Sequence, residues 1–251
     1  MNVLLHRPVK TKMSKTTRIN LWSCPRNVST AMMYSWAQRP DTVVFAEPLY
    51  AHFLINTNVE HPGKTATLAS QNNDGETVVT EILLGKIEKP VAFFKQMTHH
   101  LVALDWQFML GMQNLIFIRE PAYILNSYTK VIAEPTMLDI GVKKQIELYE
   151  YLSSNNKPPL LVDSHKFLQN PKQQLSKICA HFDVPFYQEM LQLNAVPRPE
   201  DGSWAKYWYS NVHQSTGFKP FVEKEILLPK HLQSLNDEAT FYYKQLLDKA
   251  I

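Results

Sequence analysis

The segment that decides the fold is a short apolar run followed by a polar loop, and it reads Ile19-Asn20-Leu21-Trp22-Ser23-Cys24-Pro25-Arg26-Asn27-Val28-Ser29-Thr30. The run Ile19–Ser23 is mostly apolar, as is typical of a buried parallel strand. Apolar residues then recur at three- and four-residue spacing over 29–38, which predicts a helix. The polar loop between this strand and this helix would bring backbone N–H groups, the Arg26 guanidinium and the hydroxyls of Ser29 and Thr30 to the positive end of the helix. Such an arrangement binds an oxyanion such as phosphate or sulfate.

Four further short apolar runs follow along the chain, at 42–46, 91–95, 115–119 and 160–163. Helical periodicity separates and follows them, over 99–112, 121–153, about three turns after Asn170, and 229–247. Alternating strands and helices predict an α/β fold, a three-layer parallel sheet with flanking helices. We expect one domain over 18–251 after a loose leader, 1–17. The stretch 77–84 fits a strand or a helix, and 56–76 forms a polar excursion.

Composition restricts the class of protein. The chain has 251 residues, 45% of them hydrophobic and 20% charged, which excludes a disordered or fibrous chain. Its net charge of +3 is too small for a general nucleic-acid or membrane-surface binder. The sequence contains no uninterrupted run of roughly 18 apolar residues, so it predicts no membrane span. The N-terminal residues lack the apolar core of a secretory signal. Two cysteines exclude a disulfide framework, so we expect a cytoplasmic protein without nucleic-acid or membrane partners.

Polar side chains directly follow each predicted strand. Glu47 follows the second strand, Lys95 ends the third, Arg119 ends the fourth and Asp163 ends the fifth. Because the carboxyl ends of parallel strands share one edge of a sheet, we expect these groups to form a site there. The alternative is that each polar residue only caps the helix that follows it.

Two of these loops have the chemistry of anion sites. The first lacks the Gly-Lys-[Ser/Thr] ending of a P-loop, since Val28 and Ser29 stand in those places, and this disfavours a Mg-nucleoside triphosphatase. Arg119 precedes a helix start at Pro121, and Ser127 follows eight residues after the arginine. Two anion sites on one sheet edge would suit a nucleotide with phosphates at its 5′ and 3′ positions. Alternatively, Arg119 forms a surface ion pair.

These motifs resemble those of sulfotransferases. Residues 23–30 resemble their 5′-phosphosulfate loop, and Arg119-Glu120-Pro121 with Ser127 resembles their 3′-phosphate motif, Arg-Asp-Pro with a later Ser. Glu47-Pro48-Leu49 is similar to a segment of carbohydrate sulfotransferases. A soluble subgroup has a Lys-Asp-Met-x-x-His segment and a Trp-Tyr…Ser-Thr-Gly-Phe ending, and both resemble stretches here, 95–100 and 208–218. The resemblance covers residues 18 to 219, with the motifs in the family's order.

The resemblance implies a P-loop NTPase-like fold and transfer of a sulfuryl group from 3′-phosphoadenosine 5′-phosphosulfate (PAPS). It implies a hydroxyl or amine of a small acceptor and no metal ion. Carried over by position, the residues that hold the 5′-phosphosulfate are Arg26, Asn27, Ser29 and Thr30, and those that hold the 3′-phosphate are Arg119 and Ser127. The sequence departs from the family at Val28, Glu120 and Gln96. Because β-branched residues avoid positive φ, we expect the loop at Val28 to take another backbone path.

The remaining roles concern proton transfer and charge. Arg26 is the candidate for stabilising the leaving oxygen, and Lys95 either orients the sulfate or pairs with Glu47. We favour Glu47 as general base over His100, with His99 as the third choice.

Other features of the sequence leave alternatives open. Cys24 lies in the anion loop, which favours a lowered thiol pKa, but it has no base beside it and we interpret it as a packing residue. A stretch of aromatic residues either covers the nucleotide, lines the acceptor pocket or packs on the core: Trp204, Tyr207, Trp208, Tyr209 and Phe218. Two other function classes stay open, a P-loop-type kinase or hydrolase and a non-catalytic nucleotide-binding module. The acceptor and the oligomeric state are not specified by the sequence.

Overall fold

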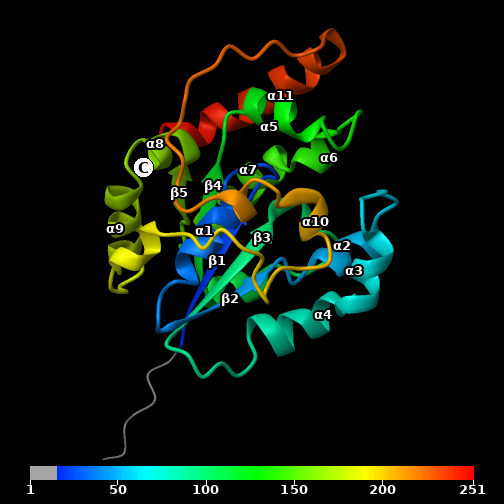
Figure 1. The fold of residues 1–251 in the computed structure, drawn as a ribbon. Helices are drawn as coiled ribbons and strands as arrows, with labels where there is room; N and C mark the ends of the chain where they lie inside the picture. The colour runs from blue at the N-terminus through cyan, green and yellow to red at the C-terminus, as the bar shows by residue number, and fades with distance from the viewer. Residues whose placement is uncertain (1–15) are drawn as a thin grey trace, which may run out of the picture.

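The computed structural model describes residues 16–251, which form a five-stranded parallel sheet between two layers of helices (Figure 1). The order across the sheet is β2-β3-β1-β4-β5. The bounds of the strands are β1 Thr17–Ser23, β2 Thr42–Ala46, β3 Val91–Met97, β4 Gln113–Ile118 and β5 Leu160–Asp163. All five predicted strands are confirmed within two residues at each end. Most of the expected leader, residues 1–15, lies outside the described part of the chain.

The central strand β1 brings the ends of its neighbours to one edge. Leu21 pairs with Lys95 of β3 and with Leu115 of β4, and every neighbouring pair of strands runs parallel. The carboxyl ends of all five strands therefore face the same way. This places the loops after β1, β2, β3 and β4 around a common opening.

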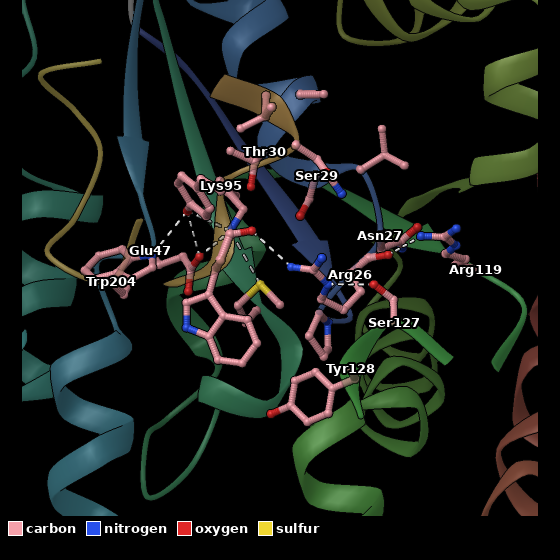
Figure 2. A pocket seen from close by; sticks show the side chains of 18 of the residues that line it. Arg26, Asn27, Ser29, Thr30, Glu47, Lys95, Arg119, Ser127, Tyr128 and Trp204 are labelled. Carbon is pink, nitrogen blue, oxygen red and sulfur yellow. Dashed lines mark hydrogen bonds and ion pairs between the residues drawn. The ribbon is translucent and has the colours of Figure 1, made fainter. Parts of the chain in front are cut away.

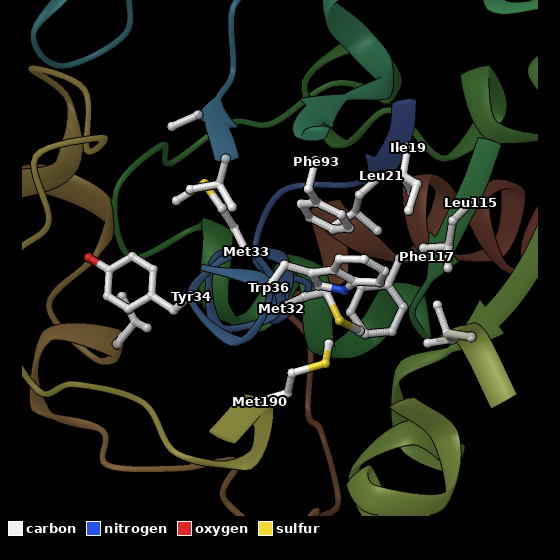
Figure 3. Close-up of a cluster of buried hydrophobic side chains, with 14 of the residues drawn as sticks. Ile19, Leu21, Met32, Met33, Tyr34, Trp36, Phe93, Leu115, Phe117 and Met190 are labelled. Carbon is white, nitrogen blue, oxygen red and sulfur yellow. The ribbon is translucent and has the colours of Figure 1, made fainter. Parts of the chain in front are cut away.

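Side chains that alternate along the strands fill two apolar layers, one on each face of the sheet. On β3, Phe93 belongs to one layer and Phe94 to the other. The helices α1 (Ser29–Trp36), α8 (Ser164–Gln169) and α9 (Pro171–His181) pack into the first layer, and α5 (Pro121–Tyr128), α7 (Val142–Ser154) and α11 (Gln233–Leu247) pack into the second. In the first layer, Trp36 stacks on Phe93 with ring centroids 4.6 Å apart (Figure 3). The predicted three-layer arrangement is confirmed.

Shorter elements complete the fold. The remaining α-helices are α2 Tyr50–Asn56, α3 Lys64–Ser70, α4 Gly75–Thr77, α6 Met137–Ile140 and α10 Ala205–Trp208. A π-helical turn, η1, covers Val78–Leu83, and the 3₁₀ turns are η2 Thr98–His100, η3 Gln107–Gly111, η4 Gln188–Leu191, η5 Val212–Gln214 and η6 Lys230–Leu232. The ambiguous stretch 77–84 is thus helical. Between residues 16 and 251, no helix has both the length and the apolar character needed to cross a membrane.

Two predicted helices are wrong in extent. The stretch 99–112 is not one helix, because the Asp105 carboxylate accepts a hydrogen bond from the Gln107 N–H at 2.8 Å and starts a separate 3₁₀ turn. The stretch 121–153 is three helices. A reciprocal pair of hydrogen bonds between Thr136 and Asp139 starts α6, and Gly141, with φ of 65°, ends it before α7 begins.

Candidate active site

The loop after β1 has two residues in the left-handed region, Arg26 with φ of 59° and Val28 with φ of 60°. The expectation that Val28 would force another backbone path is therefore wrong. Each non-glycine residue in this region costs about 1 to 3 kcal/mol, so the surroundings must impose the conformation. The Asn27 amide donates to the Phe117 carbonyl, and the Arg119 guanidinium donates to the Arg26 carbonyl. Contacts from β4 and its end thus hold the loop in the conformation that glycine would otherwise supply.

The two predicted anion motifs meet in space. Arg26 Nε donates to Ser127 Oγ at 2.9 Å, although the two residues lie 101 positions apart (Figure 2). Arg119 lies on the other side of the loop, where its side chain packs over the Tyr123 ring at 5.6 Å. Burial and the nearby positive charge of Arg26 lower the pKa of Arg119. Among residues 16–251 Arg119 makes no ion pair, so the surface ion pair considered from the sequence is wrong.

All ten candidate residues named from the sequence, with His99 included, line one cavity of about 350 Å³. Ser29 and Thr30 lie at the first turn of α1 and face it with the anion loop (Figure 2). The aromatic stretch contributes to the same cavity through Trp204, Trp208, Tyr209 and Phe218. The sheet topology therefore brings these ten residues together, as predicted from their positions after the strands. The expectation is wrong for Asp163, which does not line the cavity. Its carboxylate instead caps α8, accepting hydrogen bonds from the N–H groups of His165 and Lys166.

A buried ion pair occupies the side of the cavity next to β2 and β3. The Lys95 ammonium contacts Glu47 Oε1, and the two side chains are only 3% and 8% exposed. Pairing of Lys95 with Glu47, one of the two alternatives considered for this lysine, is confirmed. The Tyr209 hydroxyl donates to the same Glu47 oxygen at 3.0 Å. Glu47 itself has φ of 46°, a third left-handed residue at this site.

His99 and His100 are both buried. The His100 ring packs against Tyr50 and Phe53, with centroids 4.8 and 5.0 Å away. Burial, reinforced by the nearby His61 and Lys95, keeps the pKa of His100 well below its usual value. Both ring nitrogens of His100 are occluded and lack a hydrogen-bond partner within the described chain. His100 is therefore a neutral group whose nitrogens are not open to the cavity.

Sequence reasoning missed a polar cluster around His61. The His61 Nδ1 is 2.9 Å from the Tyr50 hydroxyl, and its Nε2 is 3.4 Å from the Tyr128 hydroxyl and 3.9 Å from Asp139. Burial acts to raise the pKa of Asp139, but the neighbouring His61 and Thr136 outweigh it and hold the pKa at about 2. His61 comes from the polar excursion, where no periodicity or strand end marks it. The only available signal was that Tyr50 and Tyr128 closely follow the predicted site residues Glu47 and Ser127.

Cys24 is fully buried below the anion loop. Burial raises the pKa of its thiol, so the lowered value expected from the loop is wrong. A packing role, the interpretation preferred from the sequence, agrees with this environment.

Comparisons with known proteins agree with this geometry. A family model described as "Sulfotransferase domain" matches residues 17–249. The sulfotransferase domain of an olefin synthase from Synechococcus PCC 7002 superposes with a TM-score of 0.57 at 15% identity, covering 92% of this chain and 96% of that one. A mouse sulfotransferase complexed with PAP gives a TM-score of 0.55 at 12% identity, covering 95% and 91%. At these identities the likeness concerns the fold, and it confirms the predicted fold class.

Two curated relatives come from Arabidopsis thaliana and are named branched-chain-amino-acid aminotransferase-like proteins 1 and 2. They are 37% and 38% identical over 207 and 201 residues, which are 82% and 80% of this chain. The aligned part is only 37% and 36% of those proteins, so the chain spans little more than a third of their length. The family model, in contrast, covers nearly all of the described residues. The chain belongs to the sulfotransferase family.

Proposed function

We propose that the chain transfers a sulfuryl group from PAPS to a hydroxyl or amine of a small acceptor. The observation that carries the proposal is the meeting of the two anion motifs at Arg26. Its side chain is hydrogen-bonded to Ser127, and its carbonyl accepts from Arg119, 93 residues away. Both contacts lie at the cavity that also holds Glu47 and Lys95.

The donor half of the cavity suits a nucleotide with two anionic ends. The residues that would hold the 5′-phosphosulfate are Arg26, Asn27, Ser29 and Thr30, with the N–H groups that begin α1. Arg119 and Ser127 would hold the 3′-phosphate. The Arg119 Nε is buried without a hydrogen-bond partner within residues 16–251, and a phosphate oxygen would satisfy it. When bound, PAPS supplies the sulfuryl group and departs as the 3′,5′-bisphosphate.

Glu47 is the better supported general base. Its Oε1 is fixed by Lys95 and Tyr209, whereas Oε2 makes no hydrogen bond to any described residue and is not occluded. The ring nitrogens of His100 are occluded. We propose that Glu47 Oε2 takes the acceptor's proton while Arg26 stabilises the charge on the leaving oxygen. Lys95 pairs with Glu47 and would face the transferring group from the cavity wall. Arginine and lysine side chains supply the positive charge that the transfer needs, so we expect no metal requirement.

The cavity and the two cysteines bear on the acceptor and on the cellular environment of the reaction. We propose that a small acceptor enters the same cavity, which has a volume of about 350 Å³, beside Glu47 and Lys95. Cys24 and Cys179 are free and buried, which suits the reducing, cytoplasmic environment that we propose for residues 18–251 as one domain.

Calorimetric titration with the 3′,5′-bisphosphate tests the donor site. We expect micromolar binding in EDTA that weakens at least about 50-fold in Arg119→Ala, because the buried guanidinium proposed to contact the 3′-phosphate is lost. Arg198→Ala is the matched control, since Arg198 pairs with Glu200 outside the cavity. Binding of Mg-ADP in preference to the bisphosphate would favour the kinase or hydrolase class. Bisphosphate binding without transfer to any acceptor would favour the non-catalytic module.

A further inference from the structure

The hydroxyl of Tyr209 lies at the centre of the polar contacts around Glu47. It donates to Glu47 Oε1 at 3.0 Å, and it accepts from Trp204 Nε1 at 3.2 Å and from the Lys95 ammonium at 3.4 Å. Tyr209 is only 4% exposed and, like Glu47, is buried. A hydroxyl with two donors on its oxygen directs its own single proton along the remaining direction, which is toward the carboxylate. Among residues 16–251, the carboxylate therefore has two fixed partners on one oxygen and none on the other.

The segment that carries Tyr209 also contacts the part of the cavity proposed to bind the nucleotide. The Trp208 carbonyl accepts a hydrogen bond from Arg26 at 3.0 Å, and the Trp208 ring stacks on Tyr128 at 5.7 Å. Trp204, at the start of the same short helix α10, packs edge-on against Tyr50 at 5.0 Å. Adjacent residues 208 and 209 thus hold, respectively, the arginine and the carboxylate that the proposed transfer uses. A displacement of α10 would change the position of both groups.

We propose that Tyr209 is the positioning residue that orients Glu47 for proton abstraction, an inference that rests on the proposed function. In this scheme the acceptor O–H or N–H proton passes to Glu47 Oε2 as the acceptor–sulfur bond forms. The bond from sulfur to the bridging oxygen breaks, and its electron pair stays on the departing nucleotide. Tyr209 keeps its own proton throughout and donates to Oε1. Its contribution is therefore geometric and electrostatic, exerted through Glu47.

Tyr209→Phe removes the hydroxyl and leaves the ring in place. Within the described part of the chain Lys95 then remains the only partner of Oε1, and the carboxylate can turn about its last side-chain bond. Loss of a hydrogen bond to the ionised form makes that form less favourable, so the carboxylate should take up a proton at higher pH. Tyr243→Phe is the matched control, because the Tyr243 hydroxyl donates to the Asp163 carboxylate at 2.9 Å and is also buried. Neither Tyr243 nor Asp163 lines the cavity.

The first test is a titration followed by carbon-13 NMR of protein labelled at glutamate carboxyl carbons, with the Glu47 signal assigned through Glu47→Gln. We expect its midpoint to rise by about one pH unit in Tyr209→Phe and to stay within about 0.2 unit in Tyr243→Phe. An unchanged midpoint in Tyr209→Phe would overturn the proposal. This measurement requires no acceptor, so its outcome is independent of whether the chain transfers sulfuryl groups.

The second test uses the acceptor found by screening. We expect kcat of Tyr209→Phe to fall about tenfold at pH 7, with the acidic limb of its pH profile moved upward and bisphosphate affinity unchanged within about twofold. A uniform loss at every pH, or an equal loss in Tyr243→Phe, would show a merely structural role and contradict the proposal. A wild-type protein that transfers nothing, while its Glu47 titration still depends on Tyr209, would instead refute the proposed function and its catalytic use of Tyr209.

Discussion

Replacement of Lys95 by Met isolates the buried ion pair of the site. Methionine has a similar length and no charge, so Lys95→Met keeps most of the packing and leaves the Glu47 carboxylate buried without its cation. Removing one partner of a buried pair destabilises a protein by about 3 to 5 kcal/mol. We expect a loss near the lower limit, about 3 kcal/mol, because the Tyr209 hydroxyl still donates to Glu47.

The pH dependence and a second substitution sharpen this expectation. Protonation removes the stranded charge, so the penalty of Lys95→Met should shrink as the pH falls from 7.5 to 5. The double variant Lys95→Met, Glu47→Gln has no charge at either position. It should recover at least about 2 kcal/mol of the loss at pH 7.5.

Urea unfolding followed by circular dichroism, for the wild type, both single variants and the double variant, measures these differences as a thermodynamic cycle. Equal losses at pH 5 and 7.5, or additive effects of the two substitutions, would refute the argument that the pair is buried and coupled.

Three further predictions concern the anion loop, the cluster around His61 and the buried thiols. Val28→Gly should change the free energy of unfolding by less than about 1 kcal/mol in urea denaturation. Glycine adopts the left-handed conformation without strain, and this gain offsets the lost packing and the greater conformational entropy of glycine in the unfolded chain. A loss above about 2 kcal/mol would contradict this. Asp139→Asn should destabilise by about 1 to 2 kcal/mol at pH 7. Its carboxylate has a lowered pKa, so the difference should be complete above about pH 4 and disappear toward pH 2 in acid-unfolding curves, and a constant difference would be inconsistent with it. Burial raises the pKa of Cys179 to about 11 and raises that of Cys24 as well. Both thiols should therefore react with iodoacetamide at pH 8 about 100-fold more slowly in native than in urea-unfolded protein. Fast labelling of the native protein would contradict this.

The sequence predicted the parallel sheet well because each buried strand is a short, nearly continuous apolar run bounded by polar residues. Parallel strands then bring their carboxyl ends to one edge, so Glu47, Lys95 and Arg119 could be placed together without any knowledge of tertiary contacts. Helix extents were less predictable. The divisions at Asp105 and Gly141 depend on local hydrogen bonds and on one left-handed residue, whereas apolar periodicity continues across them.

Other features of the site depend on contacts between distant segments. Val28 adopts a conformation that its side chain disfavours because Asn27 and Arg119 fix the loop against β4. His61 and Tyr209 enter the site from irregular segments, and no spacing rule relates them to the strand ends. The burial of His100 against two aromatic rings likewise follows from packing, and it changes the role that its position in the sequence suggested.

The most direct test of the account is transfer of label from sulfur-35 PAPS to a panel of small alcohols, phenols and amines, with the wild type and Glu47→Gln compared in EDTA. We expect a labelled product from the wild type without added metal. In Glu47→Gln the rate should fall at least about 100-fold while bisphosphate affinity stays within about threefold, because the base is lost and the donor site is not. Transfer at the wild-type rate by Glu47→Gln would contradict the assigned base. Bisphosphate binding with no labelled product from any acceptor would contradict the proposed sulfuryl transfer itself.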